Sequence, residues 1–264
     1  MARSRTFAVA LAFILLTGGL LVAMQWQKRQ SEPDVRPDFS SYPAGEARKA
    51  AFLAYFGPVV DATNRRWQDR RQRLQRLLSE PASEANERWL SALAEFFDIE
   101  AEPFEVEHSQ RQLVEALLVH VDTVPRSLAL AQAAKESAWG ASRFAREGNN
   151  YFGQRCFRER CGMIPANRPP GTSFEVRRFQ SPAHSVASYM INLNSHHQYA
   201  GFRDYRARQR RLGLPVNGLC AAGTISSYSE RDQAYVEELK AIIRINGLEQ
   251  PAECPNGDLQ GEQA

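Results

Sequence analysis

The sequence predicts a mainly α-helical chain with a small amount of β-structure, that is, an α+β chain dominated by helices. Several stretches place apolar residues at helical spacing, whereas FEVRRF at 174–179 alternates in the manner of a short strand. Hydrophobic residues make up 43% of the chain and charged residues 24%, which is ordinary for a folded protein. With 264 residues, the chain is long enough for one large domain or two small ones.

The N-terminal segment is a candidate for membrane anchoring or export. Residues 7–24 form an apolar run without a charge, with arginines before it and Lys28 and Arg29 after it. The pattern predicts a secretory signal or a retained anchor, and the absence of a small-x-small cleavage site favours the anchor. We therefore expect a signal-anchor at 1–26, followed by a proline-containing linker at 27–46 and an exported remainder.

Helices are expected along much of the chain after the linker. The stretch 47–78 predicts one long helix, or two shorter helices separated near Pro58. Its arginines between 65 and 76 indicate a solvated helix face, with attraction of an anionic polymer as the alternative. Further helices are expected at 84–97, at 109–121, from Ser181 to about residue 193, and from about residue 230. The stretch 203–211, which is rich in arginine, is expected to be a second basic polar patch.

The stretch from 128 to 140 carries the main functional signal. Residues 128–134 are apolar except for Gln132, which predicts a helix buried on every side that stops near Gly140. Glu136 lies at its end, with Trp139 three residues on. A carboxyl group beside an indole in apolar surroundings should have a raised pKa and can act as a general acid. Lys135 is a poor partner because adjacent helical residues do not face each other, but Glu136 in water or paired with an arginine is the alternative.

The longer segment AQAAKESAWGASRFAREGNNYFG, at 131–153, resembles the bacterial glucosaminidases of glycoside hydrolase family 73, and among them the Bax-like proteins. The resemblance runs from about 114 to 248. It implies a lysozyme-like helical domain with a small β-rich lobe at 108–250, preceded by a helical region at 47–107 and followed by a tail at 251–264. It also implies an enzyme that cleaves peptidoglycan glycan strands as an endo-β-N-acetylglucosaminidase. With the expected N-terminal anchor, this enzyme would be held in the cytoplasmic membrane and face the periplasm; with a cleaved signal it would be released into the periplasm.

Two other functions stay open at this point. A lytic transglycosylase also places a catalytic Glu-Ser at the end of a buried helix, and a cell-wall-binding scaffold would keep the fold without catalysis. No cofactor is expected, and a net charge of +3 is too small to indicate a nucleic-acid partner.

The resemblance assigns the acid role to Glu136 and leaves the second catalytic group open. We prefer Glu175, in the expected strand, to Glu159, which lies between two cysteines; an exposed strand carboxylate is the alternative. Tyr228 stands where the family has a tyrosine that faces the cleft, so its hydroxyl could position a water or the substrate's N-acetyl group. The candidate substrate-binding aromatics are Trp139, Tyr151 and Phe152, although the last two could equally close the core under the Gly-Asn-Asn turn.

The four cysteines agree with export. An even number in an exported chain suggests disulfides, and proximity favours Cys156 with Cys161 and Cys220 with Cys254 among three possible pairings. A zinc site is the weaker hypothesis, because the chain has no C-x-x-C and its His-His pair lacks helical ligand spacing.

Overall fold

The computed structural model describes residues 36–80, 83–99, 107–166, 168, 171–228, 232–251 and 254. The expected signal-anchor, residues 27–35 of the expected linker and most of the C-terminal tail lie outside these residues. Residues 36–46 of the expected linker are described, and Phe39 among them is buried in the core. Within the described ranges, no helix has both the length and the apolar character needed to cross a bilayer. The described residues from 37 onward form one compact unit.

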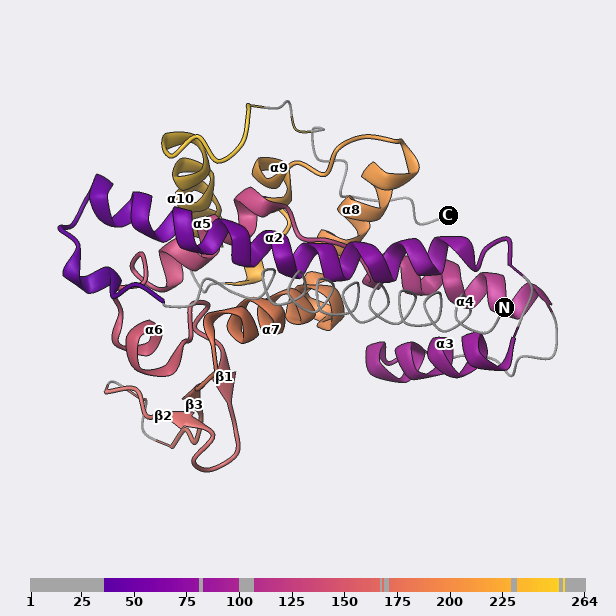
Figure 1. Ribbon diagram of the computed structural model, residues 1–264, viewed down its shortest axis with the longest axis horizontal. Coiled ribbons are helices and arrows are strands. Elements are labelled where there is room, and N and C mark those ends of the chain that lie inside the picture. Colours follow the sequence, from indigo (N-terminus) through magenta and orange to yellow (C-terminus); the bar gives the residue numbers. More distant parts are fainter. Residues whose placement is uncertain are drawn as a thin grey trace, which may run out of the picture. The chain divides into compact units, whose positions relative to one another are not determined.

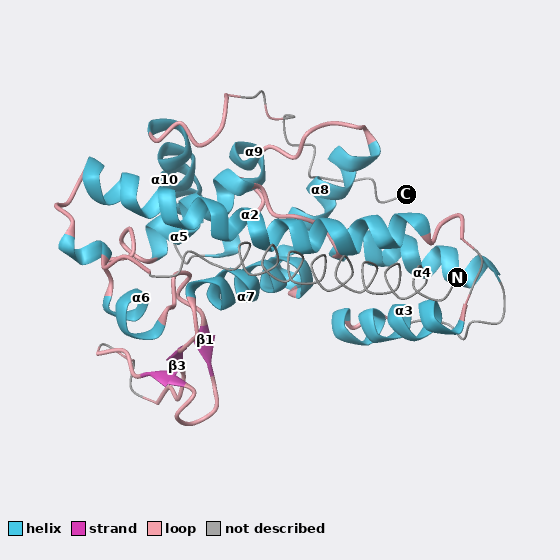
Figure 2. Cartoon of the chain, in the orientation of Figure 1, coloured by secondary structure: helices cyan, strands magenta, loops and turns pink. Residues whose placement is uncertain are grey.

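The prediction of a mainly helical chain is confirmed (Figure 2). The helices and 3-10 turns, in order, are η1 (Phe39–Ser41), α2 (Glu46–Arg76), α3 (Glu84–Phe97), α4 (Glu107–His120), α5 (Arg126–Glu136), α6 (Arg143–Gly148), α7 (Pro182–Ser195), η2 (His197–Tyr199), α8 (Ala200–Arg211), α9 (Gly218–Ala222), η3 (Ser226–Tyr228) and α10 (Asp232–Ile245).

Helix α2 continues through Pro58, so the single-helix alternative is the correct one (Figure 1). A proline removes the N–H that would bond to the carbonyl four residues earlier, here that of Ala54. Pro58 and Ala54 are both exposed, so this carbonyl can bind water and the helix need not break. The opposite face of α2 is buried and contacts α4, α5 and α7.

Helix α5 lies at the centre of the fold, as its apolar sequence predicts. Every side chain from Ser127 to Ala134 is buried, and the helix contacts α2, α9 and α10. It ends at Glu136, four residues before the expected stop. Ala138 and Trp139 adopt left-handed backbone angles (φ 51° and 55°), and the Ser137 hydroxyl donates to the Ala133 carbonyl while accepting from the Gly140 amide. The chain therefore turns away directly after Glu136.

The β-structure is a small antiparallel sheet of three very short strands, in the order β1-β3-β2. Its strands are β1 (Arg155–Cys156), β2 (Gly162–Met163) and β3 (Glu175–Arg177), so the expected strand at 174–179 is present in shortened form. Cys156 pairs with Glu175 across β1 and β3, and a disulfide joins Cys156 to Cys161. The second disulfide joins Cys220 to Cys254, which is the pairing that proximity favours.

Helix α8 was expected only as a basic polar patch, and this expectation is wrong. Arg203 and Arg206 of α8 are buried, at 6% and 0% exposure. Arg206 donates to the backbone carbonyls of Val119 and Thr123 and also to Asn194, and it faces the buried carboxylate of Asp122. The arginines of α8 therefore join this helix to the segment between α4 and α5.

Candidate active site

Glu136 is half-buried at the C-terminal end of α5, next to the turn that follows α6. A Cβ atom added at Gly153 would stand 3.7 Å from its Oε2 atom. Gly153 is exposed and has a left-handed φ of +65°, a conformation that suits glycine. The segment NNYFG thus brings a residue without a side chain to the carboxyl group, which leaves that side open.

The other side of the carboxyl group is enclosed by buried polar side chains from three helices. Tyr235 of α10 hydrogen-bonds to Glu136. Gln132, one helical turn earlier on α5, donates through Nε2 to the Tyr235 hydroxyl at 2.9 Å. The hydroxyl of Tyr189, on α7, donates to Oε1 of Gln132. Gln132 and Tyr189 are completely buried and Tyr235 is 1% exposed.

Burial raises the pKa of Glu136 above its ordinary value. The hydrogen bond from Tyr235 and the charge of Lys135 oppose this effect but do not cancel it. The predicted direction of the pKa shift is therefore confirmed. A carboxyl group that keeps its proton to higher pH suits general acid catalysis.

Lys135 does not pair with the adjacent Glu136, in line with the sequence argument. Its Nζ atom forms an ion pair with Glu238 of α10 and lies 5.5 Å from the centre of the Tyr235 ring. Because Glu238 partly neutralises the ammonium group, the stabilisation that Lys135 gives to ionised Glu136 is limited.

Tyr228 belongs to the same aromatic group as the partner of Glu136. Its ring is parallel to that of Tyr235, with centroids 5.8 Å apart, and its hydroxyl donates to the Phe152 carbonyl at 2.9 Å. Burial raises the pKa of Tyr228 well above its ordinary value, so the phenol remains neutral. Since the hydroxyl proton is already used, the Tyr228 oxygen can only accept a further hydrogen bond.

Glu175 is buried in β3, so the alternative of an exposed strand carboxylate is wrong. Its two oxygens accept hydrogen bonds from the backbone N–H groups of Arg160 (3.1 Å) and Gly162 (2.7 Å). Among the residues that the structure describes, no hydrogen bond or ion pair links Glu175 to Glu136. Glu175 therefore holds the loop that the first disulfide closes, and its predicted catalytic role has no contact to support it.

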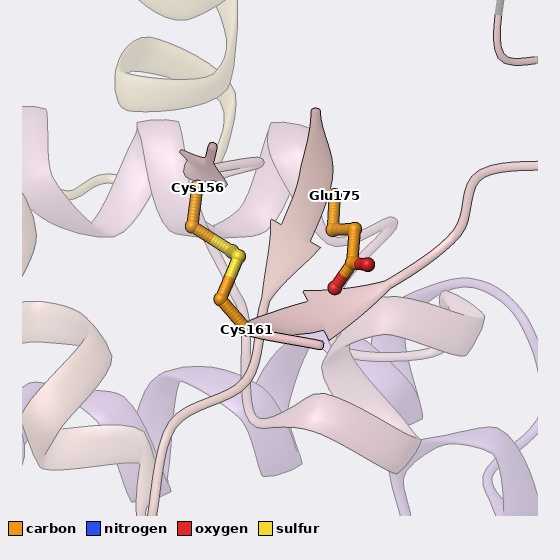
Figure 3. Close-up of side chains that lie close together, drawn as sticks. All are labelled: Cys156, Cys161 and Glu175. Atoms are coloured by element: carbon orange, nitrogen blue, oxygen red, sulfur yellow. A yellow bond between two sulfur atoms is a disulfide. The ribbon is translucent and has the colours of Figure 1, made fainter. Parts of the chain in front are cut away.

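The same carboxylate lies beside the disulfide of Cys156 and Cys161, as Figure 3 shows. One potential ligand atom from each of the three residues lies within 4.8 Å of the others. The two sulfur atoms are bonded to each other, however, and a metal ion needs thiolates. This cluster therefore stabilises the loop and is not a metal site.

The prediction that Tyr151 and Phe152 bind substrate is wrong, and the alternative that they close the core is correct. They are 0% and 2% exposed, so neither ring can touch a ligand. Tyr151 packs on Phe56 of α2 with ring centroids 4.4 Å apart, and Phe152 stacks on Tyr189 at 4.0 Å. The two rings attach the turn that carries Gly153 to the helical core.

Trp139 is half-buried and packs edge-on against Phe52 of α2, with ring centroids 5.7 Å apart. The ammonium group of Lys49 lies 5.8 Å from the centre of the indole. Because part of the ring stays exposed, its role in substrate binding remains a prediction.

The sequence argument missed Gln132, Tyr189 and Tyr235. Gln132 did leave a signal: it is the one polar residue in the apolar run, and residues four apart lie on the same helix face. A buried amide at that position needs hydrogen-bond partners, and its nearest polar neighbour along the helix face is Glu136. The tyrosines left no comparable signal.

The family model of the glucosaminidases, described as "Mannosyl-glycoprotein endo-beta-N-acetylglucosaminidase", matches residues 114–248. "Protein bax" of Escherichia coli (strain K12) is 28% identical over 223 residues, covering 84% of this chain and 78% of that protein. No solved structure matches the chain. The family match spans slightly more than half of the sequence and includes Glu136, Gly153, Tyr228 and Tyr235. The chain therefore belongs to the glucosaminidase family.

Proposed function

We propose that this protein hydrolyses the glycan strands of peptidoglycan as an endo-β-N-acetylglucosaminidase, with Glu136 as the general acid. The observation that carries the proposal is the half-buried carboxyl group at the end of α5, with a raised pKa and one side open at Gly153. Membership of the glucosaminidase family supports a glycosidic bond as the target. The helical body with a small β-rich lobe beginning just after Gly153 supports a lysozyme-like arrangement.

In the proposed reaction, Glu136 gives its proton to the glycosidic oxygen as the bond between that oxygen and the anomeric carbon breaks. The anomeric carbon gains positive character and finally takes the oxygen of a water molecule. The proton from that water restores the carboxylic acid. Each cut therefore consumes one water and leaves a reducing N-acetylglucosamine end.

Beside the general acid, the reaction needs a second catalytic group that stabilises the anomeric carbon. The substrate's own N-acetyl group fits this role best, because its carbonyl oxygen can attack the anomeric carbon. The acetamido N–H becomes more acidic as this happens and needs an acceptor. The oxygen of Tyr228 can accept that hydrogen bond, because its own proton is given to Phe152. Glu175 fits the role less well, since backbone N–H groups already bind both of its oxygens.

The test is digestion of purified sacculi with the full-length chain, borohydride reduction of the fragments and mass spectrometry. We expect glucosaminitol ends. Fragments with 1,6-anhydro-muramic ends would show a lytic transglycosylase, and binding to the sacculus without soluble product would show a scaffold.

Three variants assign the residues. Glu136→Gln keeps the side-chain shape without the titrating proton and should lower the rate at least about a hundredfold. Tyr228→Phe should lower it by a smaller factor, whereas Glu175→Gln should act on stability more than on rate. Glu159→Gln, an exposed carboxylate in the disulfide loop, is the matched control. Digestion by Glu136→Gln at the wild-type rate would contradict the assignment.

We further propose that the protein works in the periplasm. The two disulfides support an oxidising compartment.

A further inference from the structure

Gln132 uses both ends of its buried amide. Its oxygen accepts from Tyr189, and its nitrogen donates to the Tyr235 hydroxyl at 2.9 Å. We call this series of hydrogen bonds, from Tyr189 through Gln132 and Tyr235 to Glu136, the relay. An amide oxygen can only accept and an amide nitrogen can only donate, so the direction of each hydrogen bond in the relay is determined. The Tyr235 oxygen receives a hydrogen from Gln132, and the Tyr235 hydrogen is left for Glu136. Every donor in the relay therefore points toward the carboxyl group.

We propose that Gln132 and Tyr235 are positioning residues that reserve one carboxyl oxygen of Glu136 as a hydrogen-bond acceptor. The proton that Glu136 donates is then carried by the other oxygen. This inference rests on the proposed function, because it takes Glu136 as the acid. It adds to that function by naming the two residues that determine where the acid proton sits.

The relay also acts on the reaction itself. As Glu136 loses its proton, the carboxyl group becomes an anion and the hydrogen bond from Tyr235 becomes charge-assisted and stronger. An interaction that strengthens toward the transition state raises kcat more than it changes KM. Tyr189 supports this effect from a distance, by holding the amide of Gln132 in one orientation.

Several other groups face the carboxyl group, and the expected pH dependence must not come from them. Lys135 is paired with Glu238, and the nearby phenols are those of Tyr199 and Tyr228. Burial raises the pKa of both phenols, so neither ionises where a carboxylic acid titrates. The ion pair of Lys135 is unchanged by the substitutions below.

The experiment compares Tyr235→Phe, Gln132→Met and Tyr189→Phe, each of which removes one polar contact and keeps a similar volume. Tyr205→Phe is the matched control, because Tyr205 is a partly buried tyrosine whose hydroxyl lies 3.5 Å from the Asn217 carbonyl. The kcat and KM on soluble peptidoglycan fragments are measured across pH. We expect kcat to fall on the order of tenfold for Tyr235→Phe, the size of one hydrogen bond to a charged group. The fall should be smaller for Gln132→Met and smallest for Tyr189→Phe, with KM changed less than about twofold.

The pH profile separates positioning from a structural role. Tyr235 stabilises the ionised form of Glu136, so its removal should raise the pKa and move the basic limb of the kcat profile to higher pH. The shift of the basic limb to higher pH should be largest for Tyr235→Phe, smaller for Gln132→Met and smallest for Tyr189→Phe, as for the fall in kcat. Tyr205→Phe should leave the limb at its wild-type pH. A reduced kcat with an unmoved limb would overturn the proposal, as would a Gln132→Met variant with the wild-type profile.

A second measurement does not depend on activity. The Glu136 carboxyl carbon is followed by 13C NMR as the pH is raised, and its signal is assigned by its loss in Glu136→Gln. An upward pKa change in Tyr235→Phe and in Gln132→Met supports the relay, and an unchanged pKa in both overturns it. If the wild-type chain releases no glycosidic product, the proposed function is wrong. The titration would still show whether Gln132 and Tyr235 act on the pKa of Glu136.

Discussion

Replacing Asp122 with asparagine should lower the free energy of unfolding by about 3–5 kcal/mol, the typical cost of breaking a buried ion pair from one side. Asp122 is 1% exposed and faces Arg71 of α2 at 3.3 Å and, from α8, Arg210 at 3.0 Å and Arg206 at 3.7 Å. Asparagine keeps the size of the side chain but removes its charge. Among the described residues, the completely buried guanidinium group of Arg206 then has no counter-charge.

The burial of each arginine determines where this cost arises. The side chains of Arg71 and Arg210 are 13% and 38% exposed, so water can solvate their charges in part when the Asp122 carboxylate is removed. Arg206 has no such compensation, and burial already lowers its pKa to about 10 even with Asp122 in place. For a chain of this size the loss corresponds to a fall in Tm of roughly 10 °C. Urea denaturation at pH 7 measures it.

Asp61→Asn is the matched control. It breaks an ion pair with Arg126 at 3.0 Å in which the two side chains are 41% and 47% exposed. Such surface pairs contribute at most about 1 kcal/mol.

The dependence on pH gives a second check. Burial alone would raise the pKa of Asp122, but Arg206, Arg210 and Arg71 outweigh it and lower the pKa below its ordinary value. A carboxylate with a lowered pKa stabilises the fold above its unfolded pKa of about 3.9, and this stabilisation is lost as pH falls through the folded pKa. The difference between wild type and Asp122→Asn should therefore stay constant from about pH 5 to 8 and shrink below about pH 4. A difference of zero at pH 7, or one that persists in acid, would refute the reasoning.

Two further predictions concern the turn beside Glu136 and the cysteines. Gly153→Ala should lower the free energy of unfolding by about 1 kcal/mol, because residue 153 has a left-handed backbone conformation. It should also reduce kcat, because the added methyl group narrows the open side of Glu136. Thermal melting and kinetics measure the two effects, and an unchanged kcat would show that the substrate does not use this side. Protein purified without reductant should show no alkylated cysteine, since Cys220 is paired with Cys254 and Cys156 with Cys161. Mass spectrometry that finds four labelled thiols would contradict the disulfides.

Much of the helical framework could be predicted because its signals are local. The apolar spacing and the N-cap of α3, where the Ser83 side chain accepts from the Asn86 amide, lie within a few neighbouring residues. The buried character of α5 followed from its composition in the same way. Its end did not, because left-handed angles at Ala138 and Trp139 are unusual for residues with a Cβ atom.

The misjudged α8 has a related cause. A run of arginines indicates a solvated face unless a buried acceptor is present elsewhere in the chain. Here Asp122 and Val119 lie more than 80 residues before Arg206 along the chain, so no local pattern shows that its charge is satisfied.

The sequence likewise predicted only part of the candidate site. Glu136 could be named from its position at the end of an apolar helix and from the family resemblance. Tyr235, which hydrogen-bonds to it, is 103 residues away from Gln132, and only the fold brings them together. Tyr151 and Phe152 were misassigned because a turn with two aromatic residues looks the same in sequence whether its rings line a cleft or fill a core.

The last prediction concerns residues 37–106, all of which precede the family match. Helix α2 contacts α5 and α7, and its Phe52 and Phe56 are completely buried. The ring of Phe56 packs on Tyr151, which holds the turn that carries Gly153 beside Glu136.

Burying one phenylalanine side chain contributes about 1.5–3 kcal/mol, and α2 buries two of them together with Val60, Trp67 and Leu74. Their sum is comparable to the net stability of a whole domain, about 5–15 kcal/mol. A chain that begins at residue 107 should therefore fail to show a cooperative thermal transition, whereas one that begins at residue 37 should show it. Circular dichroism during heating distinguishes the two. A cooperative transition and wild-type activity in the shorter chain would mean that the family segment folds alone and that α2 only covers it.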